Sequence, residues 1–370
     1  MSLNTTSHGS TAPGEGSSRR GLTGPARLRA SMLAVVGAAT LAFVTACGGG
    51  TTGNGAESGS ATGSATGSGE AGTVSVEHAQ GTTEVPVDPE KVFVFDLGVM
   101  DSMNSLGIQP AGVPEAAYPE ELKPVADAAE VRIGAMKEPD FETIASEDPD
   151  LIIISARTAE AYPELSKIAP TIDLSVDQKD QMGSFKENVT TLGEIFGEEE
   201  AVEAKLAEID SKVEDARTTL KEAGDTNGLI VLTSAGEVTA YGAGSRFGLI
   251  HDVLGVPTAA DVKAEGPHGE SVSFEFIAQT DPENLFVIDR DAATGEGGAN
   301  AAAVLDNDLV NGTKAARNGK IIQLNPADWY LVGYGLDSLP RMIDEVVNHV
   351  ATQSTTGAGT TGTGSDASEN

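Results

Sequence analysis

The chain has 370 residues, 56 acidic and 23 basic side chains, five histidines and a formal net charge of −33. Its length is enough for two domains of ordinary size. The large acidic excess disfavours nucleic acid as a partner, because phosphate binding needs a basic surface. Five histidines are also too few for a metal centre built from several imidazole ligands.

The N-terminal segment, residues 1–46, has the pattern of a signal peptide. Arginines precede the apolar stretch "ASMLAVVGAATLAFVTAC", which ends at Cys47, the only cysteine. The ending "VTAC" resembles a bacterial lipobox, whose cysteine is acylated, typically with palmitate, and becomes the first residue of the mature lipoprotein. We therefore expect a lipid anchor on Cys47; the alternative is a transmembrane anchor that ends in cysteine by chance. The motif "SRRGL" is a weak twin-arginine signal and leaves the secretion route open.

Two further segments are of low complexity. Residues 47–72 consist mostly of Gly, Ser, Thr and Ala, a composition that cannot bury a core. We expect a flexible tether there, spanning about 25–30 Å as a coil. Residues 351–370 are expected to form a disordered tail.

Between these segments, short apolar runs alternate with helical patterns, which predicts two α/β lobes with mostly parallel sheets. The N-terminal lobe is expected over residues 73–182 and the C-terminal lobe over residues 224–350. The run "LIIIS" is of the continuous type expected for buried parallel strands. The predicted strands are 91–96, 151–155, 169–175, 228–235, 238–242, 284–289 and 320–325.

Residues 183–223 form a connecting helical segment in which no strand pattern occurs. Apolar residues recur there at spacings of three and four, which predicts one buried stripe on a long helix. The stripe consists of Val202, Leu206, Ile209, Val213, Ala216 and Leu220. We expect this helix to cross once from one lobe to the other.

One phrase occurs twice at a constant offset of 133 residues, once in each predicted lobe. "FETIASEDPDLIIISAR" (141–157) and "FEFIAQTDPENLFVIDR" (274–290) share seven of seventeen positions, and both end on an arginine. Because ligands of parallel α/β sheets bind beyond the carboxyl ends of the strands, Arg157 and Arg290 are expected on opposite sides of one cleft.

A third arginine, Arg246, lies in the Gly-rich loop "AYGAGSRFG" after the predicted strand 238–242. Three converging guanidiniums suit a compact, highly charged anion, with hydrogen bonds worth about 1.5–3 kcal/mol each. The alternative is that these arginines form ordinary surface ion pairs with the many acids.

Several motifs together resemble the substrate-binding lipoproteins of ferric-siderophore ABC importers, in particular the catecholate-binding subgroup that includes petrobactin binders. They are "AYGAGSRFGLIHDVLG", "HGESVSFEFIA" and "NLFVIDRDAA", and the resemblance covers residues 73–350. It implies the class III periplasmic-binding-protein fold, with two doubly wound α/β lobes joined by one long helix. It also implies a monomer on the extracytoplasmic face of the membrane that is not an enzyme and has no intrinsic cofactor.

The resemblance also implies roles for particular residues. The family's basic triad falls on Arg157, Arg246 and Arg290, which would balance the three negative charges of a ferric tris-catecholate. Lys137 in "GAMKEPDFE" would add a fourth cation.

His268 and Tyr330 match positions that bind iron directly in some relatives, where the siderophore leaves coordination sites empty. Phenolate oxygen is a good ligand for ferric iron and imidazole a borderline one. The alternatives are a loop histidine and a tyrosine packed at a lobe edge. His251 lies in a helical pattern typical of a structural residue, and His78 and His349 belong to no visible constellation.

Glu142 and Glu275 are the second residues of the two repeated phrases. In related importers one acid on each lobe docks against arginines of the dimeric permease, so the resemblance implies this role here. The alternative is that both acids only favour the dipole of the helix they begin.

Other functions fit the sequence less well than siderophore binding does. A haem or vitamin B12 binder on the same fold would need less positive charge. A zinc- or manganese-binding protein would need converging ligands, which the scattered histidines do not supply. A secreted hydrolase would need a motif such as a nucleophile elbow, a P-loop or HExxH, and none occurs. In an adhesion or structural lipoprotein the placement of the arginines would be accidental.

Overall fold

The computed structural model describes residues 72–224, 226–263 and 268–351. The predicted signal peptide, Cys47, most of the predicted tether and nearly all of the predicted tail lie outside the described residues. The described residues form one compact unit. None of the helices within them is long and apolar enough to cross a membrane.

The first lobe is built on a six-stranded sheet with the order β6-β5-β4-β3-β7-β8. Its strands pair in parallel except for the short edge strand β6, so the predicted parallel sheet is confirmed here. The strands are β3 Val92–Val94, β4 Gly112–Glu115, β5 Val131–Ala135, β6 Glu138–Pro139, β7 Leu151–Ile154 and β8 Thr171–Asp173. The helices are α1 Leu97–Ser105, α2 Lys123–Ala128, α3 Phe141–Glu147, η1 Ala159–Ala161 and α4 Tyr162–Leu165.

An antiparallel hairpin, β1 Thr73–His78 and β2 Gly81–Pro86, precedes this sheet. It was not expected from the sequence. Val76 and Val85 are buried against the first lobe's core, which explains why this N-terminal hairpin is ordered.

The second lobe has a five-stranded sheet with the order β11-β10-β9-β12-β13. The strands are β9 Gly228–Ser234, β10 Glu237–Tyr241, β11 Glu270–Ser271, β12 Asn284–Asp289 and β13 Ile321–Gln323. The helical segments are η2 Leu249–Val253, α7 Phe274–Thr280, α8 Arg290–Thr294, α9 Ala301–Leu305, α10 Asp308–Asn311, α11 Lys314–Arg317, η4 Ala327–Val332 and α12 Ser338–Ala351. All six residues of β12 are buried, as expected for a central strand covered on both faces.

The direction of one strand in this sheet differs from the prediction. β10 pairs antiparallel with β9 through a tight turn at Ala235 and Gly236, both of which have positive φ. The end of β10 therefore lies beside Ile230, near the amino end of β9, because Tyr241 pairs with Ile230. β10 therefore does not run toward the cleft. The prediction that Arg246 lies there because it follows a parallel strand is wrong.

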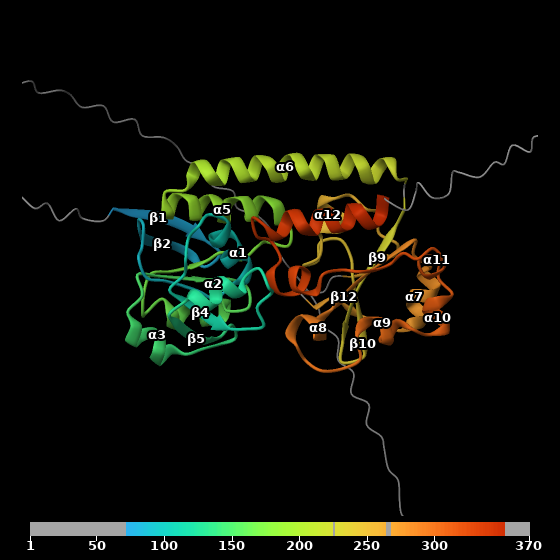
Figure 1. The fold of residues 1–370 in the computed structure, drawn as a ribbon, viewed down its shortest axis with the longest axis horizontal. Helices are drawn as coiled ribbons and strands as arrows, with labels where there is room; N and C mark the ends of the chain where they lie inside the picture. Colours follow the sequence, from blue (N-terminus) through green and yellow to red (C-terminus); the bar gives the residue numbers. More distant parts are fainter. Residues whose placement is uncertain (1–71, 225, 264–267, 352–370) are drawn as a thin grey trace, which may run out of the picture. The chain divides into compact units, whose positions relative to one another are not determined.

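The long helix expected between the lobes is α6, Glu199–Glu222, and Figure 1 shows it lying along both lobes. It follows α5, Gln181–Phe196, from which Gly197 separates it by adopting a left-handed conformation with φ of 70°. Five of the six stripe residues are buried, and Leu206 packs partly against the same core. α6 packs on α5 at one end and on α12 at the other, so it supports both lobes.

The repeated phrase forms the same unit in both lobes. α3 and α7 are helices of seven residues that end at Asp148 and Asp281, each in the left-handed conformation. The proline that follows each aspartate cannot continue the helix, and the chain then enters β7 or β12. Aspartate is one of the few residues that tolerate this backbone, which accounts for the repeated Asp-Pro.

The lobes approach each other closely at Gly98 in α1. A Cβ atom there would lie 2.7 Å from the carbonyl oxygen of Val332 and 2.9 Å from that of Tyr334. These are backbone atoms that cannot move aside, so only glycine fits.

His251 belongs to the core of the second lobe. It is 9% exposed, and its Nδ1 lies 2.7 Å from the carbonyl oxygen of Val256. Burial lowers the pKa of His251 below its ordinary 6.5. Between the folded pKa and 6.5 the unfolded chain therefore binds more protons, and acidification favours unfolding.

We expect His251→Gln to make the unfolding free energy less sensitive to pH, by up to about 1.4 kcal/mol for each unit of pKa difference that it removes. Urea titrations between pH 7.5 and 5.5 would measure the slope in the variant and in the unmodified protein. His349→Gln, at an exposed histidine, is the matched control. Equal slopes for His251→Gln and the unmodified protein would contradict the prediction.

Candidate functional site

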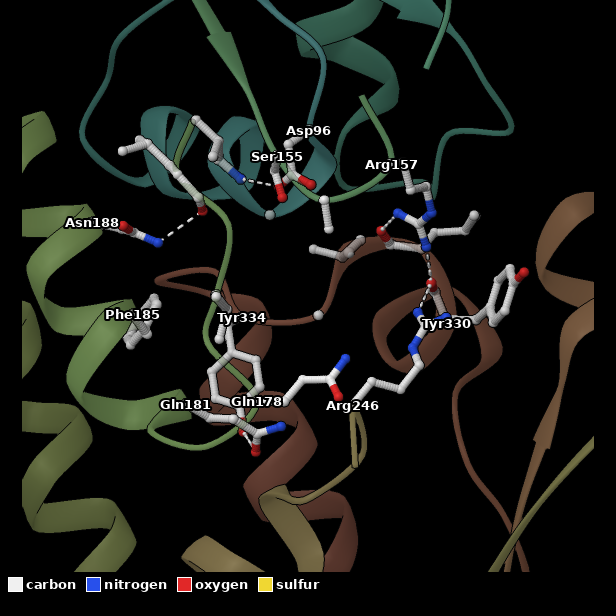
Figure 2. Close-up of a pocket in the computed structure, with 18 of the residues that line it drawn as sticks. Asp96, Ser155, Arg157, Gln178, Gln181, Phe185, Asn188, Arg246, Tyr330 and Tyr334 are labelled. Atoms are coloured by element: carbon white, nitrogen blue, oxygen red, sulfur yellow. Dashed lines mark hydrogen bonds between the residues drawn. The ribbon is translucent and has the colours of Figure 1, made fainter. Parts of the chain in front are cut away.

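A cavity of about 580 Å³ lies between the lobes. On the first lobe it is lined by α1 and its N-cap, the loop after β7 and one face of α5. On the second lobe it is lined by the loop around Arg246 and by η4 with the residues that follow it. Figure 2 shows side chains from these segments facing a common space.

Tyr330 in η4 is the centre of the arginine cluster. Its carbonyl oxygen accepts hydrogen bonds from Arg157 Nη2 and from Arg246 Nη2, the latter at 3.0 Å, and Arg157 Nη1 donates to the carbonyl of Leu331 at 3.1 Å (Figure 2). These carbonyls are free because η4 is a short π-helix that ends at Gly333. The C-terminal end of a helix also favours cations.

The ring of Tyr330 contacts all three guanidiniums. The Cζ atoms of Arg246, Arg157 and Arg290 lie 4.9, 5.6 and 5.8 Å from the ring centroid. Arg290 Nε also donates to Tyr330 Oη at 3.1 Å. The structure therefore brings together the three arginines named from the sequence, two from the second lobe and one from the first.

The three arginines differ in their counterions. Within the described residues, Arg157 and Arg246 have no carboxylate at ion-pair distance, whereas Arg290 pairs with Asp291 at 3.3 Å and with Glu296 at 2.7 Å. Burial and the charge of Arg157 both lower the pKa of the Arg246 guanidinium. The cleft therefore holds positive charge that an incoming anion would stabilise.

Arg157 and Arg246 line the cavity and Arg290 does not, whereas the remaining predicted ligand-binding residues all line it. Lys137 and His268 are exposed and line it, and Tyr330 lines it with its half-buried ring. Within the described residues there is no group of three or more histidine, cysteine, aspartate or glutamate side chains that could hold a metal ion.

Sequence reasoning missed the polar residues that position this site. Tyr334 Oη donates to Gln181 Oε1 at 2.7 Å, and Gln181 Nε2 donates to the carbonyl of Ser245 at 2.8 Å. This chain of hydrogen bonds ties α5 to the loop that carries Arg246. Asp96 is half-buried, and desolvation raises its pKa. It caps α1 through the amide of Val99 and interacts with Arg157 over a longer distance.

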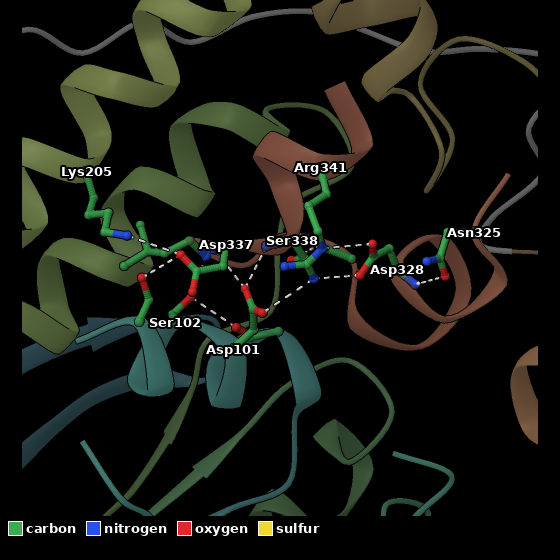
Figure 3. Close-up of polar contacts among 12 residues, drawn as sticks. Asp101, Ser102, Lys205, Asn325, Asp328, Asp337, Ser338 and Arg341 are labelled. Atoms are coloured by element: carbon green, nitrogen blue, oxygen red, sulfur yellow. Dashed lines mark hydrogen bonds and ion pairs between the residues drawn. The ribbon is translucent and has the colours of Figure 1, made fainter. Parts of the chain in front are cut away.

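A second polar cluster fixes η4 against the first lobe (Figure 3). Arg341 of α12 forms a bidentate ion pair with Asp328 of η4, at 2.7 and 3.1 Å, and lies 3.7 Å from Asp101 of α1. Asp101 Oδ2 accepts from the backbone amides of Asp337 and Ser338, both at 2.9 Å, and so caps α12 from the other lobe. The helix that carries Tyr330 is thus held from both lobes.

Glu142 and Glu275 do not line the cavity. Both are exposed in the first turn of their helices, α3 and α7, one in each lobe. The hydroxyl of Ser273 lowers the pKa of Glu275, which keeps this carboxylate ionised. The two glutamates thus occupy matching positions in α3 and α7.

Comparison with known proteins agrees with this geometry. The model of the family described as "Periplasmic binding protein" matches residues 92–327. The chain is 45% identical over 278 residues to petrobactin-binding protein YclQ of Bacillus subtilis, covering 74% of this chain and 87% of that protein. The crystal structure of YclQ superposes with a TM-score of 0.72, covering 75% of this chain and 98% of the crystallised one, at 44% identity.

Two further relatives extend the comparison. The ferric-anguibactin-binding protein FatB of Vibrio anguillarum is 33% identical over 279 residues, covering 74% of this chain and 86% of FatB. The structure of the periplasmic catecholate-siderophore binding protein VctP of Vibrio cholerae superposes with a TM-score of 0.69 at 33% identity, covering 75% of this chain and 99% of VctP.

Proposed function

We propose, from the premise that this chain belongs to the periplasmic binding protein family, that it captures a ferric siderophore outside the cytoplasm and delivers it to an ABC importer. Members of the family are binding proteins, and catalysis forms no part of the proposal. The observation that carries it is the convergence of Arg157, Arg246 and Arg290 on the ring of Tyr330, a residue that lines the cavity between the lobes.

The chemistry of the site favours a catecholate ligand. A ferric tris-catecholate has three negative charges and flat aromatic rings. Guanidiniums match the charge and stack on the rings, and the ring of Tyr330 offers a further aromatic surface. The relatives YclQ and VctP, which are named as petrobactin-binding and catecholate-siderophore binding proteins, support this class. Lys137 at the cavity adds a fourth cation.

His268 and Tyr330 would complete the coordination of iron when the siderophore is tetradentate. Both line the cavity, and the hydrogen bond from Arg290 Nε to Tyr330 Oη would stabilise a phenolate. With a hexadentate siderophore no coordination site is open and the two residues would contact the ligand only.

A quenching panel tests the proposed function. Trp329 is the only tryptophan of the chain, is 2% exposed and lines the cavity beside Tyr330, so its fluorescence reports on ligand there. Ferric catecholates, hydroxamates, citrate, haem and vitamin B12 would be titrated in parallel. Saturable quenching is expected with ferric catecholates at the lowest concentrations. If haem or vitamin B12 bound most tightly, the proposed siderophore ligand would be wrong and the alternative ligand class would be right.

We also propose that the protein is a monomer held at the extracytoplasmic face of the membrane by a lipid on Cys47. The lipobox-like sequence before this residue and the tether-like composition after it support this anchor. Mass spectrometry of the membrane-bound protein would detect the acyl chains on the N-terminal peptide.

Glu142 and Glu275 are proposed to dock the loaded protein on the permease dimer. Replacing both with alanine is expected to abolish siderophore uptake and to leave affinity unchanged, because the two carboxylates lie outside the cavity lining. Uptake of radioactive iron and quenching titrations would measure the two quantities separately. Glu203→Ala, at an exposed glutamate of α6, is the control. Weakened binding by the double variant would place these acids in ligand capture instead.

A further inference from the structure

Arg290 is fully engaged by its own chain. Its Nε donates to Tyr330 Oη, Nη1 contacts Ser234 and Asp291, and both terminal nitrogens donate to Glu296, at 2.7 and 3.0 Å. It is also missing from the residues that line the cavity, although Arg157 and Arg246 are present. The third arginine is therefore withheld from an anion in the cleft as long as Glu296 holds it.

The two carboxylates on Arg290 are held very differently. The side chain of Asp291 is 9% exposed, and its Oδ2 accepts from the backbone amide of Ala235 at 2.7 Å, so this acid is fixed. The side chain of Glu296 is 55% exposed, and its carboxylate contacts Arg290 alone among the described residues. Glu296 is therefore the partner that can leave.

The segment that carries Glu296 has little packing to resist its departure. Residues 295–300, "GEGGAN", are all exposed and connect α8 with α9. A Cβ atom at Gly297 would meet nothing within 4 Å. An exposed ion pair of this kind contributes only about 0–1 kcal/mol net, so a stronger anion can displace it.

We infer that Glu296 is a built-in competitor that occupies the third arginine until a highly charged ferric complex displaces it. The inference rests on the proposed function. An anion already held by Arg157 and Arg246 presents its remaining charge to Arg290 at high local concentration and so replaces the carboxylate. A small monoanion that reaches only one or two guanidiniums cannot do so. Glu296 would thus determine specificity for charge, favouring trianionic complexes over smaller anions.

The test is Glu296→Gln, which removes the competing charge and keeps the size of the side chain. We expect a ferric hexadentate tris-catecholate to bind up to about fivefold more tightly, as about 1 kcal/mol converts. The gain should shrink at high salt, because screening already weakens the ion pair. Glu203→Gln removes the same charge from α6, where this glutamate forms no ion pair within the described residues, and should leave affinity unchanged.

The same substitution in an Arg290→Gln background separates competition from a general charge effect. If Glu296 acts through Arg290, the gain disappears in that background. A gain that persists there, an unchanged affinity of Glu296→Gln, or a weakened one would each overturn the inference while leaving the proposed function intact. Failure of the unmodified protein to bind any ferric complex would instead overturn both. Circular dichroism melting of each variant would confirm that it is folded.

Discussion

Replacing Arg246 with alanine is expected to weaken binding of a ferric tris-catecholate by about 10- to 100-fold, the loss of one or more charge-assisted hydrogen bonds. Arg246 has no carboxylate at ion-pair distance within the described residues, so its charge is available to the ligand. It also contacts the rings of Phe247 and Tyr330, each at 4.9 Å from the centroid, which holds the guanidinium in place. Quenching of Trp329 would measure the affinity.

The counterions predict an order among the arginines. Arg290→Ala removes a cation that Asp291 and Glu296 already neutralise, so it should weaken binding less than Arg246→Ala does. Arg317→Ala, at an arginine whose side chain is 57% exposed and pairs with Asp281, should have no effect. A larger loss for Arg290→Ala than for Arg246→Ala would mean that displacing Glu296 costs little and that Arg290 dominates capture.

Thermal stability provides a separate check on Arg246. Burial and the charge of Arg157 lower the pKa of the Arg246 guanidinium, which means that the unliganded protein holds this charge at a cost. Arg246→Ala should therefore leave the melting temperature unchanged or raise it, while binding is lost. A strong drop in melting temperature would instead make Arg246 a structural residue.

Local signals in the sequence were enough to predict the two lobes and much of the site. The constant offset between the repeated phrases predicts one helix–strand unit in each lobe, and α3 with β7 and α7 with β12 are those units. Arg157 and Arg290 could be placed because the carboxyl ends of parallel strands share one edge of a sheet. The hairpin of β1 and β2 also had a signal, since "TVSVEH" and "GTTEVP" alternate around a short turn.

The antiparallel direction of β10 follows from the two-residue turn at Ala235 and Gly236, a local hairpin signal that the prediction of parallel strands overlooked. Other features depend on contacts that no local pattern encodes. The carbonyls of Tyr330 and Leu331 are free because they lie in the last turn of η4, a helix that the sequence analysis did not predict. Arg246 thus reaches the site through a loop that hydrogen bonds of Gln181 hold, not through the direction of its strand.

Asp101→Ala is expected to lower the free energy of unfolding by about 2–4 kcal/mol, since it removes a helix cap and a buried partner of an arginine. Asp101 is 2% exposed, and its carboxylate accepts from two amides at the start of α12, more than 230 residues later in the chain. Urea titrations would measure the loss. Asp127→Ala, at an exposed aspartate of α2, should change stability little.

Comparing Asp101→Asn with Asp101→Ala distinguishes the loss of the helix cap from the loss of the negative charge. Burial raises the pKa of Asp101, so its ionised form is already disfavoured, and Asp101→Asn keeps one oxygen for the amides of α12. The loss for asparagine should therefore be smaller than for alanine. In a double-mutant cycle with Arg341→Ala, a coupling energy of about 0.5–3 kcal/mol would show that the two side chains act together.

Loss of this helix cap should also affect the binding site. Arg341 holds Asp328 of η4, and η4 carries Tyr330, so a loosened α12 would let the arginine cluster move. We expect Asp101→Ala to weaken siderophore binding even at temperatures where the variant is fully folded. If stability falls and affinity stays the same, the cluster of Asp101, Arg341 and Asp328 joins the lobes without positioning Tyr330, and the geometry of the arginines must then depend on α5 and Gln181 alone.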